Sequence, residues 1–421
     1  MADKERVIKG HLENLGKYEI LAKVPLTNME ELATYYTPGV AHVSEAIRID
    51  KNKVFEYTTK ANTIAIVSDG TRILGLGDIG PEAGLPVMEG KAILFKKFGG
   101  VDAIPLCIDT KDEDEIVKFV KLIAPTFGAV NIEDISSPKN FNIVEKLAKS
   151  IPIPIFQDDN HGTAVVTLAA LLNAIKLAGK NKSVSIMING AGTAGIGIAR
   201  LLLSAGFSNL IVIDSKGALY EGRDDMNTYK QEIASKTNRN MKNGSLKELI
   251  HGTDVLIGVS RPGAFTKDLI MQMNNKPIVF ALANPEPEIE YQEAKDAGAF
   301  IVATGRSDMP NQVNNLIAFP GIMRGLLDVR AKEVSPEALV AAAATIARCV
   351  GRKKLGRDYI IPSFTDKGLA VKVVSEVAEA VALAISKQGL ARIAINEGEV
   401  KAHAKGLIRR YSRIERKIIG K

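Results

Sequence analysis

The sequence has little cysteine and no long uninterrupted apolar run. Its 421 residues include only two cysteines, Cys107 and Cys349, and no Cys-x-x-Cys pair. This excludes a disulfide framework and a cysteine metal site, so we expect both thiols to be small buried apolar groups. No stretch reaches 18 consecutive apolar residues, and the first residues lack the apolar segment of a signal peptide. We therefore expect a cytoplasmic protein without a membrane span.

Composition and charge exclude further classes. The chain is 46% hydrophobic and 24% charged, which is ordinary for a globular protein and excludes disordered and low-complexity classes. A chain of this length exceeds the size of a single core, so we expect two domains. The net charge of +7 is located at one end, because residues 401–421 hold eight Lys or Arg against one acid, Glu415. We therefore expect no nucleic-acid-binding face across the fold.

The order of apolar segments predicts an α/β protein. Two βαβ-type blocks are separated by a long apolar helix over residues 163–177, and only helical patterns follow residue 330. Strands of the first block are expected at 102–110, 128–135 and 151–159, and those of the second at 183–188, 210–214, 254–259, 277–282 and 299–304. We predict an N-terminal α/β domain (1–162), a Rossmann-like parallel-sheet domain with a helical end (163–390) and a basic C-terminal helix (391–421).

Two local patterns precede the first block. Thr27 to Glu30 has the spacing of a capping box that opens a short helix, and Thr37-Pro38-Gly39 ends it. Residues 64–67 and 73–74 flank an Asp-Gly turn, which predicts two strands joined as a hairpin. The glycine-rich stretch that follows surrounds one lysine, Lys91, and is expected to form loops that a substrate can approach.

A G-x-G-x-x-G motif follows the strand expected at 183–188. Its members are Gly190, Gly192 and Gly195, with Thr193 and Ala194 opening the next helix. Such glycines allow a tight turn and close approach of a pyrophosphate to the helix N-terminus. The alternative is a glycine-rich turn without a ligand, but strand, helix and a following acid are all in place. We predict dinucleotide binding.

The choice between NAD and NADP depends on Asp214. This acid lies nineteen residues after Gly195 at the end of the next strand, where it could accept hydrogen bonds from a ribose. Ser215 and Lys216 could instead hold a 2′-phosphate, so the pattern favours NAD only slightly. Polar residues at other strand ends, Ser260, Asn284 and Thr304, are further candidates for this edge. Asn314 and Asn315 lie farther on, before an apolar turn, and asparagines are also common in loops without a ligand.

Four acids end two successive strands of the first block. Glu133-Asp134 and Asp158-Asp159 come to one edge of neighbouring strands, because the βαβ crossover between them makes the strands parallel. Carboxylates gathered there repel one another unless a cation lies among them, and oxygen ligands suit Mg²⁺ or Mn²⁺. The alternative is helix capping by Asp158 or Asp159. His161 is expected to support or cap this segment rather than to bind metal.

A nicotinamide site beside a hard-metal site suggests oxidation of a 2-hydroxy acid, which chelates the metal and loses hydride. At these residues the chain resembles the malic enzymes, specifically the shorter prokaryotic type. The resemblance extends to about residue 390. It rests on the ordered motifs at 36–40, 68–80, 84–100, 132–134, 156–164, 190–195, 280–285 and 312–321.

This resemblance implies oxidation of L-malate and its decarboxylation to pyruvate and CO₂, with NAD or NADP and Mg²⁺ or Mn²⁺. It implies Lys91 as the general base and Tyr36 as the acid that protonates enolpyruvate, with Tyr35 as a rival. The implied metal ligands are Glu133, Asp134 and Asp159, with Asp158 close by. Arg72 would pair with a malate carboxylate, while substrate or nicotinamide contacts fall to Asn284 and Asn314 or Asn315.

Two other functions stay open, and so does the role of the C-terminal end. A malolactic-type decarboxylase would retain NAD and release lactate, and a non-catalytic nucleotide sensor could bind nucleic acid through the basic tail. A homodimer is expected. The apolar positions of the tail recur at helical spacing, which predicts a helix packed on its own body or on a partner subunit: Val400, Ala404, Leu407, Tyr411, Ile414 and Ile418.

Overall fold

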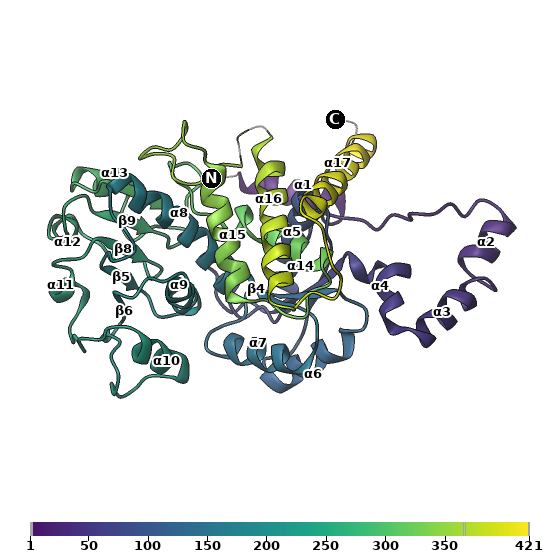
Figure 1. The fold of residues 1–421 in the computed structure, drawn as a ribbon, viewed down its shortest axis with the longest axis horizontal. Coiled ribbons are helices and arrows are strands. Elements are labelled where there is room, and N and C mark those ends of the chain that lie inside the picture. The colour runs from purple at the N-terminus through teal and green to yellow at the C-terminus, as the bar shows by residue number, and fades with distance from the viewer. Residues whose placement is uncertain (1–2, 365, 367, 420–421) are drawn as a thin grey trace.

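The computed structural model describes residues 3–364, 366 and 368–419 and contains two sheets flanked by helices (Figure 1). The first sheet has the strand order β2-β1-β3-β4 and is parallel throughout. Its strands are β1 (Thr63–Ser68), β2 (Asp102–Cys107), β3 (Ala129–Ile132) and β4 (Ile155–Gln157). All carboxyl ends therefore meet at one edge.

The second sheet has the order β10-β9-β8-β5-β6-β7 and is parallel except for the short β7. Its strands are β5 (Ile186–Asn189), β6 (Leu210–Asp214), β7 (Gly217–Ala218), β8 (Val255–Gly258), β9 (Ile278–Ala281) and β10 (Ile301–Thr304). After β5 the chain adds β6 and β7 on one side of β5 and then β8, β9 and β10 on the other side, so the direction of strand addition reverses at β5. Ligands of such sheets bind at this point.

Helices cover both sheets. Those between consecutive strands of one sheet are α5 (Pro81–Gly99), α6 (Glu113–Ile123), α7 (Lys139–Ser150), α9 (Thr193–Ser204), α10 (Thr228–Lys236), α11 (Leu246–Leu249), α12 (Lys267–Met271) and α13 (Tyr291–Asp296). Helix α6 shows how the sequence specifies them, since the Asp112 carboxylate accepts hydrogen bonds from the amides of Asp114 and Glu115. Its apolar face buries Ile116 and Val120.

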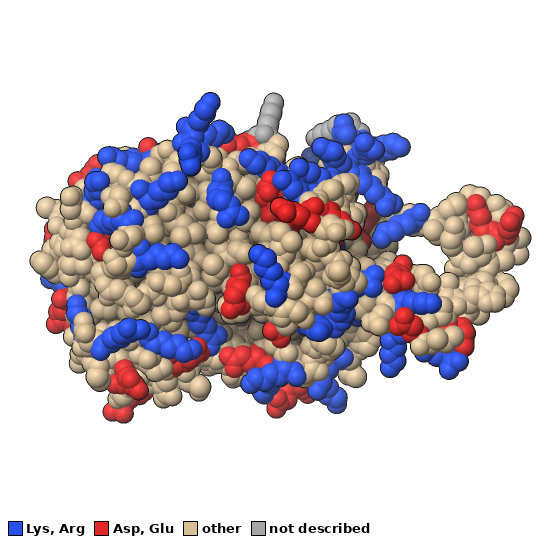
Figure 2. Space-filling model, viewed as in Figure 1, with Lys and Arg blue, Asp and Glu red and all other residues tan. Residues whose placement is uncertain are grey.

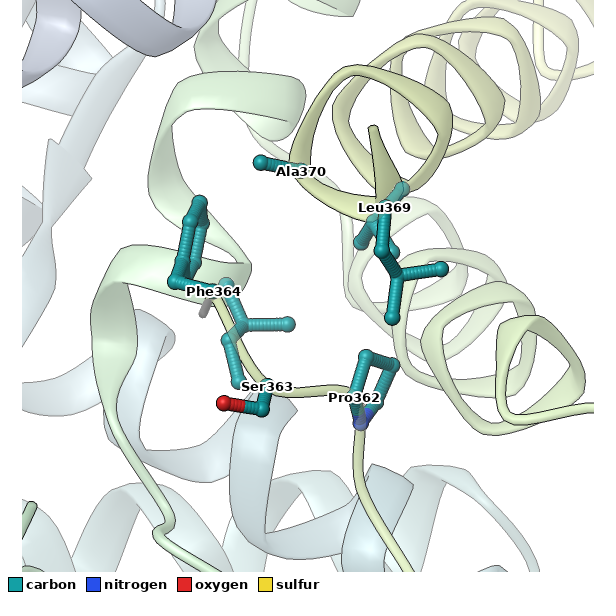
Figure 3. Close-up of a pocket in the computed structure, with 7 residues that line it drawn as sticks. Pro362, Ser363, Phe364, Leu369 and Ala370 are labelled. Atoms are coloured by element: carbon teal, nitrogen blue, oxygen red, sulfur yellow. The ribbon is translucent and has the colours of Figure 1, made fainter. Parts of the chain in front are cut away.

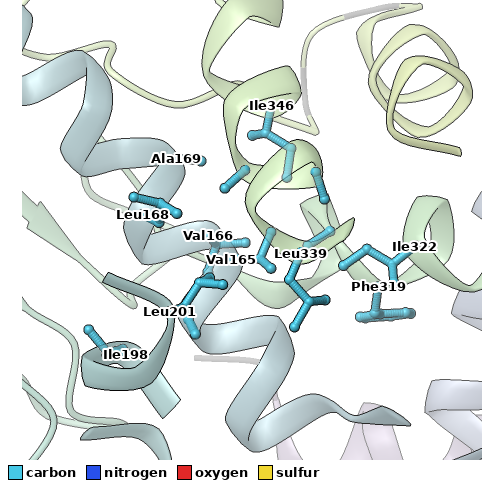
Figure 4. Packing of buried hydrophobic residues seen from close by; sticks show 14 of the residues in the cluster. Val165, Val166, Leu168, Ala169, Ile198, Leu201, Phe319, Ile322, Leu339 and Ile346 are labelled. Carbon is cyan, nitrogen blue, oxygen red and sulfur yellow. The ribbon is translucent and has the colours of Figure 1, made fainter. Parts of the chain in front are cut away.

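The main core lies between the sheets, where α8 (Thr163–Ala178) packs against α9 and α15 (Pro336–Cys349), as Figure 4 shows. Together with the turn before it, α8 is long and apolar enough to cross a membrane, but 72% of its most apolar window is buried inside the protein. The remaining helices of this layer are α14 (Phe319–Asp328) and α16 (Leu369–Lys387). They pack closely, because a Cβ at Gly325 would lie 2.4 Å from the Ala378 carbonyl.

The predicted hairpin after β1 is wrong. Strand β1 pairs in parallel with β2 and β3, while Ile73 makes only an isolated bridge to Gly77. The Asp-Gly turn does form, with Gly70 at φ 71°, but it folds the chain toward the start of α5. A Cβ at Gly70 would lie 2.2 Å from the Gly80 carbonyl oxygen, so this close crossing requires glycine.

The N-terminal elements expose nearly all their side chains. They are α1 (Lys4–Asn14), α2 (Met29–Tyr35), α3 (Val40–Ile49), η1 (Lys51–Lys53), α4 (Val54–Tyr57) and η2 (Thr59–Ala61). The predicted short helix is confirmed as α2, although Asn28 rather than Thr27 caps it, while Glu31 bonds back to Thr27. Residues 27–53, which we call the arm, project away from the body (Figure 1).

The C-terminal helix α17 (Glu399–Ile419) packs on its own chain, against α16 and α5. Val400 and Ala404 are buried, and Lys97 of α5 pairs with Glu415 at 2.9 Å. Of the two alternatives predicted for the tail, packing on its own body is therefore confirmed. Cys349 is buried and Cys107 half-buried, and both are free thiols.

Candidate functional site

The structure brings the four acids together at one sheet edge. Strands β3 and β4 are neighbours, with Ile132 opposite Gln157. Glu133 and Asp134 follow β3 directly, and Asp158 and Asp159 follow β4. The Asp134 amide donates to Asp159 Oδ2 at 3.2 Å, which joins the two pairs. The predicted juxtaposition is thus present.

Both aspartates after β4 lie on a five-residue π-helical turn, Asp158–Gly162, that leads into α8. Glycines make room for the turn. A Cβ at Gly162 would lie 1.9 Å from Asp158 Oδ1, and one at Gly197 would lie 2.3 Å from Asn160 Oδ1. The wide turn directs Asp158 toward Lys91 and Asp159 toward Arg72.

Lys91 is the cation among these acids. Helix α5 places its Nζ 2.7 Å from Asp158 Oδ2 and 2.9 Å from Glu133 Oε1. The Lys91 Nζ also lies 4.4 Å from the centre of the Phe319 ring, so one side of the ammonium faces apolar surface. Burial alone lowers the pKa of Lys91, but the charges of Asp158 and Glu133 outweigh it and raise that pKa above its ordinary value.

Arg72 lies at the open side of the cluster. Its guanidinium is 3.9 Å from Asp159 Oδ1, and its backbone amide donates to the Asp134 carbonyl at 3.1 Å. The side chain is about half exposed, so it can still bind a carboxylate from solution. Gly75 of the same loop lies next to Pro285 of the second sheet's layer, which brings this loop close to both sheets.

The acids are poised to accept a cation. Burial and the neighbouring carboxylates raise the pKa of Glu133 and of Asp159, and they raise that of Asp134 to about 7. Asp158 Oδ1 is buried without a hydrogen-bond partner. Among the described residues, no three acids, histidines or cysteines converge closely enough to hold a metal ion as they stand, and Lys91 and Arg72 pair with the carboxylates instead. The donor set itself, all oxygen, fits Mg²⁺ or Mn²⁺.

Amide side chains hold the acids in place. Asn315 Nδ2 donates to Asp158 Oδ2 at 3.0 Å and to Thr163 Oγ1 at 3.1 Å, whereas Asn314 accepts from the Leu316 amide and caps a 3₁₀ turn, η4 (Asn315–Ile317). Of the two predicted asparagines, only Asn315 therefore contacts the cluster. Sequence reasoning missed Asn131, which donates to Glu133 Oε2 at 2.6 Å. An amide inside a strand that is otherwise apolar was the available signal.

The glycine motif has the geometry of a dinucleotide loop. Gly190 has φ 122°, and a Cβ there would lie 2.5 Å from the Val259 carbonyl oxygen; at Gly195 it would lie 1.7 Å from the Gly190 carbonyl oxygen. Gly192, by contrast, has open space where a Cβ would stand. No side chain caps the start of α9 at Thr193–Ser204, so its first amides are available to phosphate. Ala194 lies in this first turn.

The two sites adjoin. Thr193, directly after Gly192, accepts a hydrogen bond from Asn140 Nδ2 at 2.7 Å, and Asn140 belongs to α7 beside the first sheet. The predicted cofactor residue Thr193 is therefore buried and fixes the interface between the two layers. The Thr193 hydroxyl is occupied by this hydrogen bond from Asn140, so the backbone amides of the loop are the groups that can contact a cofactor.

Asp214 ends β6 as predicted and is held by two cations. Its Oδ2 pairs with Arg223 and with Lys230, each at 2.6 Å, and its Oδ1 accepts from the Lys216 amide at 2.9 Å. Although burial raises its pKa, these hydrogen bonds dominate and hold the pKa of Asp214 well below its ordinary value. A carboxylate with two basic partners offers less to a ribose hydroxyl than a free one does.

This arrangement predicts the effect of Asp214→Asn on cofactor choice. The amide weakens the ribose contact and frees Arg223 and Lys230 to pair with a 2′-phosphate, so NADP⁺ gains relative to NAD⁺. One charge-assisted hydrogen bond accounts for a rise of about tenfold in the ratio of kcat/KM for the two cofactors. Initial rates with each cofactor measure this ratio. Asp224→Asn, an equal charge change on an exposed neighbour, should leave it unchanged, and an unchanged ratio in Asp214→Asn would exclude this role.

The other predicted residues of this edge differ in their surroundings. Ser260 Oγ accepts from Asn189 Nδ2 at 2.9 Å, and its amide donates at 2.7 Å to Glu288, a buried acid that sequence reasoning missed. Burial raises the pKa of Glu288. Asn284 is exposed and lies against Gly305, where a Cβ would stand 2.8 Å from its Nδ2.

The predicted acid, Tyr36, is not brought to Lys91 within the chain. It ends α2 on the projecting arm and is 63% exposed, and its rival Tyr35 is exposed as well (Figure 1). Tyr36 is therefore exposed to solvent within one chain, because the arm has no buried residue that would hold it against the body. The arm's placement therefore decides whether Tyr36 can act.

His161 supports the π-helical turn, as predicted. Its Nδ1 accepts from the Gln157 amide at 3.2 Å, and burial with the nearby charge of Arg200 lowers its pKa to about 4. The ring is therefore neutral at physiological pH. A separate shallow gap near η4, shown in Figure 3, leaves no room for a water molecule and belongs to the apolar packing. It is lined by Ile317, Pro362, Ser363, Phe364, Leu369, Ala370 and Val373.

A dinucleotide loop that adjoins a buried group of carboxylates and one lysine defines a nicotinamide-dependent oxidoreductase that works with a divalent cation. Family models agree: residues 15–148 match "Malic enzyme, N-terminal domain" and residues 161–389 match "Malic enzyme, NAD binding domain". The chain belongs to the malic enzyme family. The predicted family, fold class and NAD(P)-dependent enzyme class are thereby confirmed.

Similar proteins extend over nearly the whole chain. The bifunctional malic/malolactic enzyme of Bacillus subtilis is 52% identical over 402 residues, which cover 95% of this chain and 97% of that protein. The NAD-dependent malic enzyme of Geobacillus stearothermophilus is 49% identical and covers 90% and 78%. The crystal structure of malic enzyme from Pyrococcus horikoshii matches with a TM-score of 0.95 and 45% identity, covering 99% of this chain and 98% of that chain.

Proposed function

We propose that this chain oxidises L-malate and decarboxylates it to pyruvate and CO₂ while reducing NAD⁺ or NADP⁺. The observation that carries the proposal is Lys91, buried between Asp158 and Glu133, where the turn Asp158–Gly162 packs against α9, the helix that follows the glycine motif. The two carboxylates in contact with Lys91 raise its pKa, and a divalent cation that binds these carboxylates would lower that pKa again. Lys91 can then act as a general base whose proton affinity depends on the cation. The site unites base, metal ligands and hydride acceptor.

Glu133, Asp134 and Asp159 would hold the divalent cation, and Asp158 would adjoin it. When bound, Mg²⁺ or Mn²⁺ supplies Lewis acidity toward the hydroxyl and keto oxygens of the substrate, and the nicotinamide supplies the hydride acceptor. Lys91 takes the proton of the malate hydroxyl. Arg72 binds a malate carboxylate at the open side of the cluster, where its guanidinium is half exposed.

Three asparagines and Tyr36 complete the proposed assignment of site residues. Asn315 orients Asp158 through its 3.0 Å hydrogen bond. Asn284 and Asn314 contact substrate or nicotinamide from the second layer. Tyr36 donates the proton that converts enolpyruvate to pyruvate, because a phenol is acidic enough to do so beside cations.

We propose residues 1–162 as the substrate and metal domain, residues 163–390 as the dinucleotide domain and residues 391–421 as its C-terminal helix.

A second function is favoured by one specific observation. The Bacillus subtilis relative at 52% identity is named as bifunctional, malic and malolactic. A malolactic reaction would use the same base and acids but retain NADH, so that the cofactor returns its hydride and lactate leaves. The two reactions therefore differ in the product and not in the site.

The proposal is tested with the full-length protein, L-malate, Mn²⁺ and NAD⁺ or NADP⁺. We expect NADH or NADPH to accumulate in a one-to-one ratio with CO₂, measured by absorbance and by trapped CO₂, and pyruvate to be the organic product. Lactate with no accumulated reduced cofactor would show the malolactic reaction instead. No conversion of malate with either cofactor would overturn both. D-Malate, which presents its hydroxyl with the opposite configuration, is the matched control.

We further propose a cytoplasmic homodimer without a nucleic-acid partner. The basic residues of α17 in part pair with acids of the body, as Lys401 does with Glu376 at 2.6 Å, and others lie on its exposed face (Figure 2). A non-catalytic nucleotide sensor that binds RNA through this helix is the remaining alternative. It would show RNA binding that is lost on truncation before Asn396 while nucleotide binding is retained.

A further inference from the structure

Glu288 is a buried acid that lacks a cation. It lies shortly after β9 and is 0% exposed. Within the described part of the chain, no lysine, arginine or histidine lies within ion-pair distance of its carboxylate, whose partners are Ser260 and the Ala283 amide. A charge that is removed from water normally keeps a partner of opposite sign, because burial without one is costly.

The other buried acids that the structure describes are compensated. Each contacts a lysine or the free amides at the start of a helix, where the helix dipole is positive. The contacts are those of Asp69 with Lys139, of Glu133 and Asp158 with Lys91, and of Glu379 with the amides of Gly398 and Lys401 at the start of α17. Glu288 has neither kind of partner, which points to a positive charge that the described residues do not supply.

The contacts of Glu288 fit an ionised carboxylate. Its Oε1 accepts from the Ser260 amide at 2.7 Å and lies 3.3 Å from Ser260 Oγ, and its Oε2 accepts from the Ala283 amide at 3.0 Å. Both oxygens face donors, so a proton on either oxygen would displace one of them. Burial raises the pKa of Glu288, and the hydrogen bonds from Ser260 and Ala283 act in the opposite direction. A Cβ at Gly258 would lie 2.4 Å from the carboxyl carbon of Glu288, so the end of β8 leaves room for this group.

These partners place Glu288 at the edge of the second sheet, beyond the glycine motif. Ser260 follows β8 and Ala283 follows β9, while Asn189, which ends β5 just before the motif, donates to Ser260 Oγ at 2.9 Å. Asp214 lies on the opposite side of β5, at the end of β6. A dinucleotide with its adenosine at β6 and its pyrophosphate at the start of α9 therefore reaches β8 and β9 with its nicotinamide.

The loop that leads from β9 to Glu288 also approaches the acid cluster. A Cβ at Gly75, on the loop that begins at Arg72, would lie 3.4 Å from Pro285 Cδ, and Pro285 precedes Glu288 by three residues. A hydride passes directly between substrate and cofactor, so the nicotinamide has to lie close to both loops. Glu288 is therefore the buried negative charge on the nicotinamide side of the cofactor site.

We propose that Glu288 supplies the counter-charge for the oxidised nicotinamide, so that this one carboxylate favours binding of NAD⁺ or NADP⁺ over NADH or NADPH. The oxidised ring is positively charged, and the hydride that it accepts carries two electrons and neutralises it. The attraction to Glu288 exists before the transfer and is lost after it, which favours release of the reduced cofactor. Glu288 acts through its charge and through the loops that it positions, and it takes no part in the chemical step.

The inference goes beyond the proposed reaction, because it concerns the oxidation state of the cofactor and not the substrate. It is tested by binding alone. Isothermal titration calorimetry, with saturating Mg²⁺ to neutralise the acid cluster and without malate, gives Kd for NAD⁺, NADH and ADP-ribose in wild-type protein and in Glu288→Gln. ADP-ribose keeps the adenosine and pyrophosphate but lacks the ring. NADP⁺, NADPH and their 2′-phosphorylated ADP-ribose replace the three probes if that set binds more tightly.

We expect Glu288→Gln to raise the ratio of Kd for NAD⁺ to Kd for NADH by about tenfold, the order of magnitude for one charge pair at the edge of a protein interior. Any loss of loop geometry weakens NAD⁺ and NADH alike and cancels in this ratio. The Kd for ADP-ribose, which has no ring charge, should follow that for NADH. Parallel weakening of all three probes would show a purely structural tie between the loops, and it would overturn the proposal, as would an unchanged ratio.

Two further variants separate charge from geometry. Glu288→Asp keeps the charge but shortens the side chain, so the ratio should stay near that of wild type even if all three probes bind more weakly. Glu286→Gln removes an equal charge from an exposed position of the same loop and should leave the ratio unchanged, because water screens that charge. A ratio that rises as much in Glu288→Asp as in Glu288→Gln would contradict the proposed role of the charge.

Wild-type protein carries the test if Glu288→Gln does not fold. Under the same conditions it should bind NAD⁺ more tightly than NADH, and the opposite order would overturn the proposal. The inference and the proposed reaction also fail separately. If the ratio shifts as described but malate is not converted, the reaction is wrong and the role of Glu288 stands. If malate is converted and the ratio does not move, the reaction stands and the role of Glu288 is wrong.

Discussion

Replacing Lys91 by alanine is expected to lower kcat for malate oxidation by about 10³-fold, the usual contribution of a general base. The ammonium contacts Asp158 and Glu133 and faces the Phe319 ring, so no other described lysine or histidine takes its place beside these two carboxylates. The residual rate should also lose the pH dependence that a titrating base imposes. Initial rates across pH, with saturating malate and Mn²⁺, measure both effects.

A partial reaction separates catalysis from folding in this variant. Oxaloacetate already has its ketone, so its decarboxylation needs no base at the hydroxyl and should persist in Lys91→Ala above the rate with Mn²⁺ alone. Lys97→Ala, on the same helix but paired with Glu415, should behave as wild type in both reactions. Near-normal malate oxidation by Lys91→Ala would assign the base elsewhere. Loss of both reactions together would point to disruption of the acid cluster, because two buried carboxylates lose their partner.

Tyr36→Phe is expected to slow the last step and leave the earlier ones intact. The variant should bind NAD⁺ and Mn²⁺ normally, since Tyr36 lies on the arm and contacts neither proposed binding site within its chain. Conversion of enolpyruvate to pyruvate needs a proton on C3, and loss of its donor should reduce that step by about 10²-fold or more. Exchange of tritium from water into the methyl group of pyruvate reports this step directly.

Tyr35→Phe is the matched control, because it removes the same hydroxyl one residue away. We expect tritium exchange to be unchanged in that variant. If Tyr35→Phe slows exchange and Tyr36→Phe does not, the roles are reversed. If neither variant changes exchange, the proton comes from another group.

The features that sequence predicted well follow from local pattern and from the topology of parallel sheets. A glycine motif between a strand and a helix fixes its own geometry, and Gly190 and Gly195 indeed lie where any Cβ would collide. Acids that end neighbouring parallel strands must meet at one edge, which is why the order of strands and helices is enough to place Glu133 and Asp134 beside Asp158 and Asp159. Neither inference needed contacts between distant segments.

The features that sequence missed depend on such distant contacts. Arg223 and Lys230 clamp Asp214 from positions that no motif marks, and Asn131 and Glu288 are buried polar residues whose partners come from the fold. The hairpin was predicted from an Asp-Gly turn that does form, but β1 had stronger partners in β2 and β3. The helix α2 of the arm was predicted, but the position of the arm was not, because its side chains have no core within the chain to specify that position.

The π-helical turn Asp158–Gly162 makes the site sensitive to the number of residues in this segment. Such a turn accommodates one more residue than an α-helical turn. Deleting Asn160 would let α8 continue in regular α form, and one residue corresponds to a rotation of about 100° around the helix axis. The two adjacent aspartates could then no longer serve Lys91 and Arg72 together. We expect homologous chains to tolerate exchange of side chains in this segment far better than a single-residue gap.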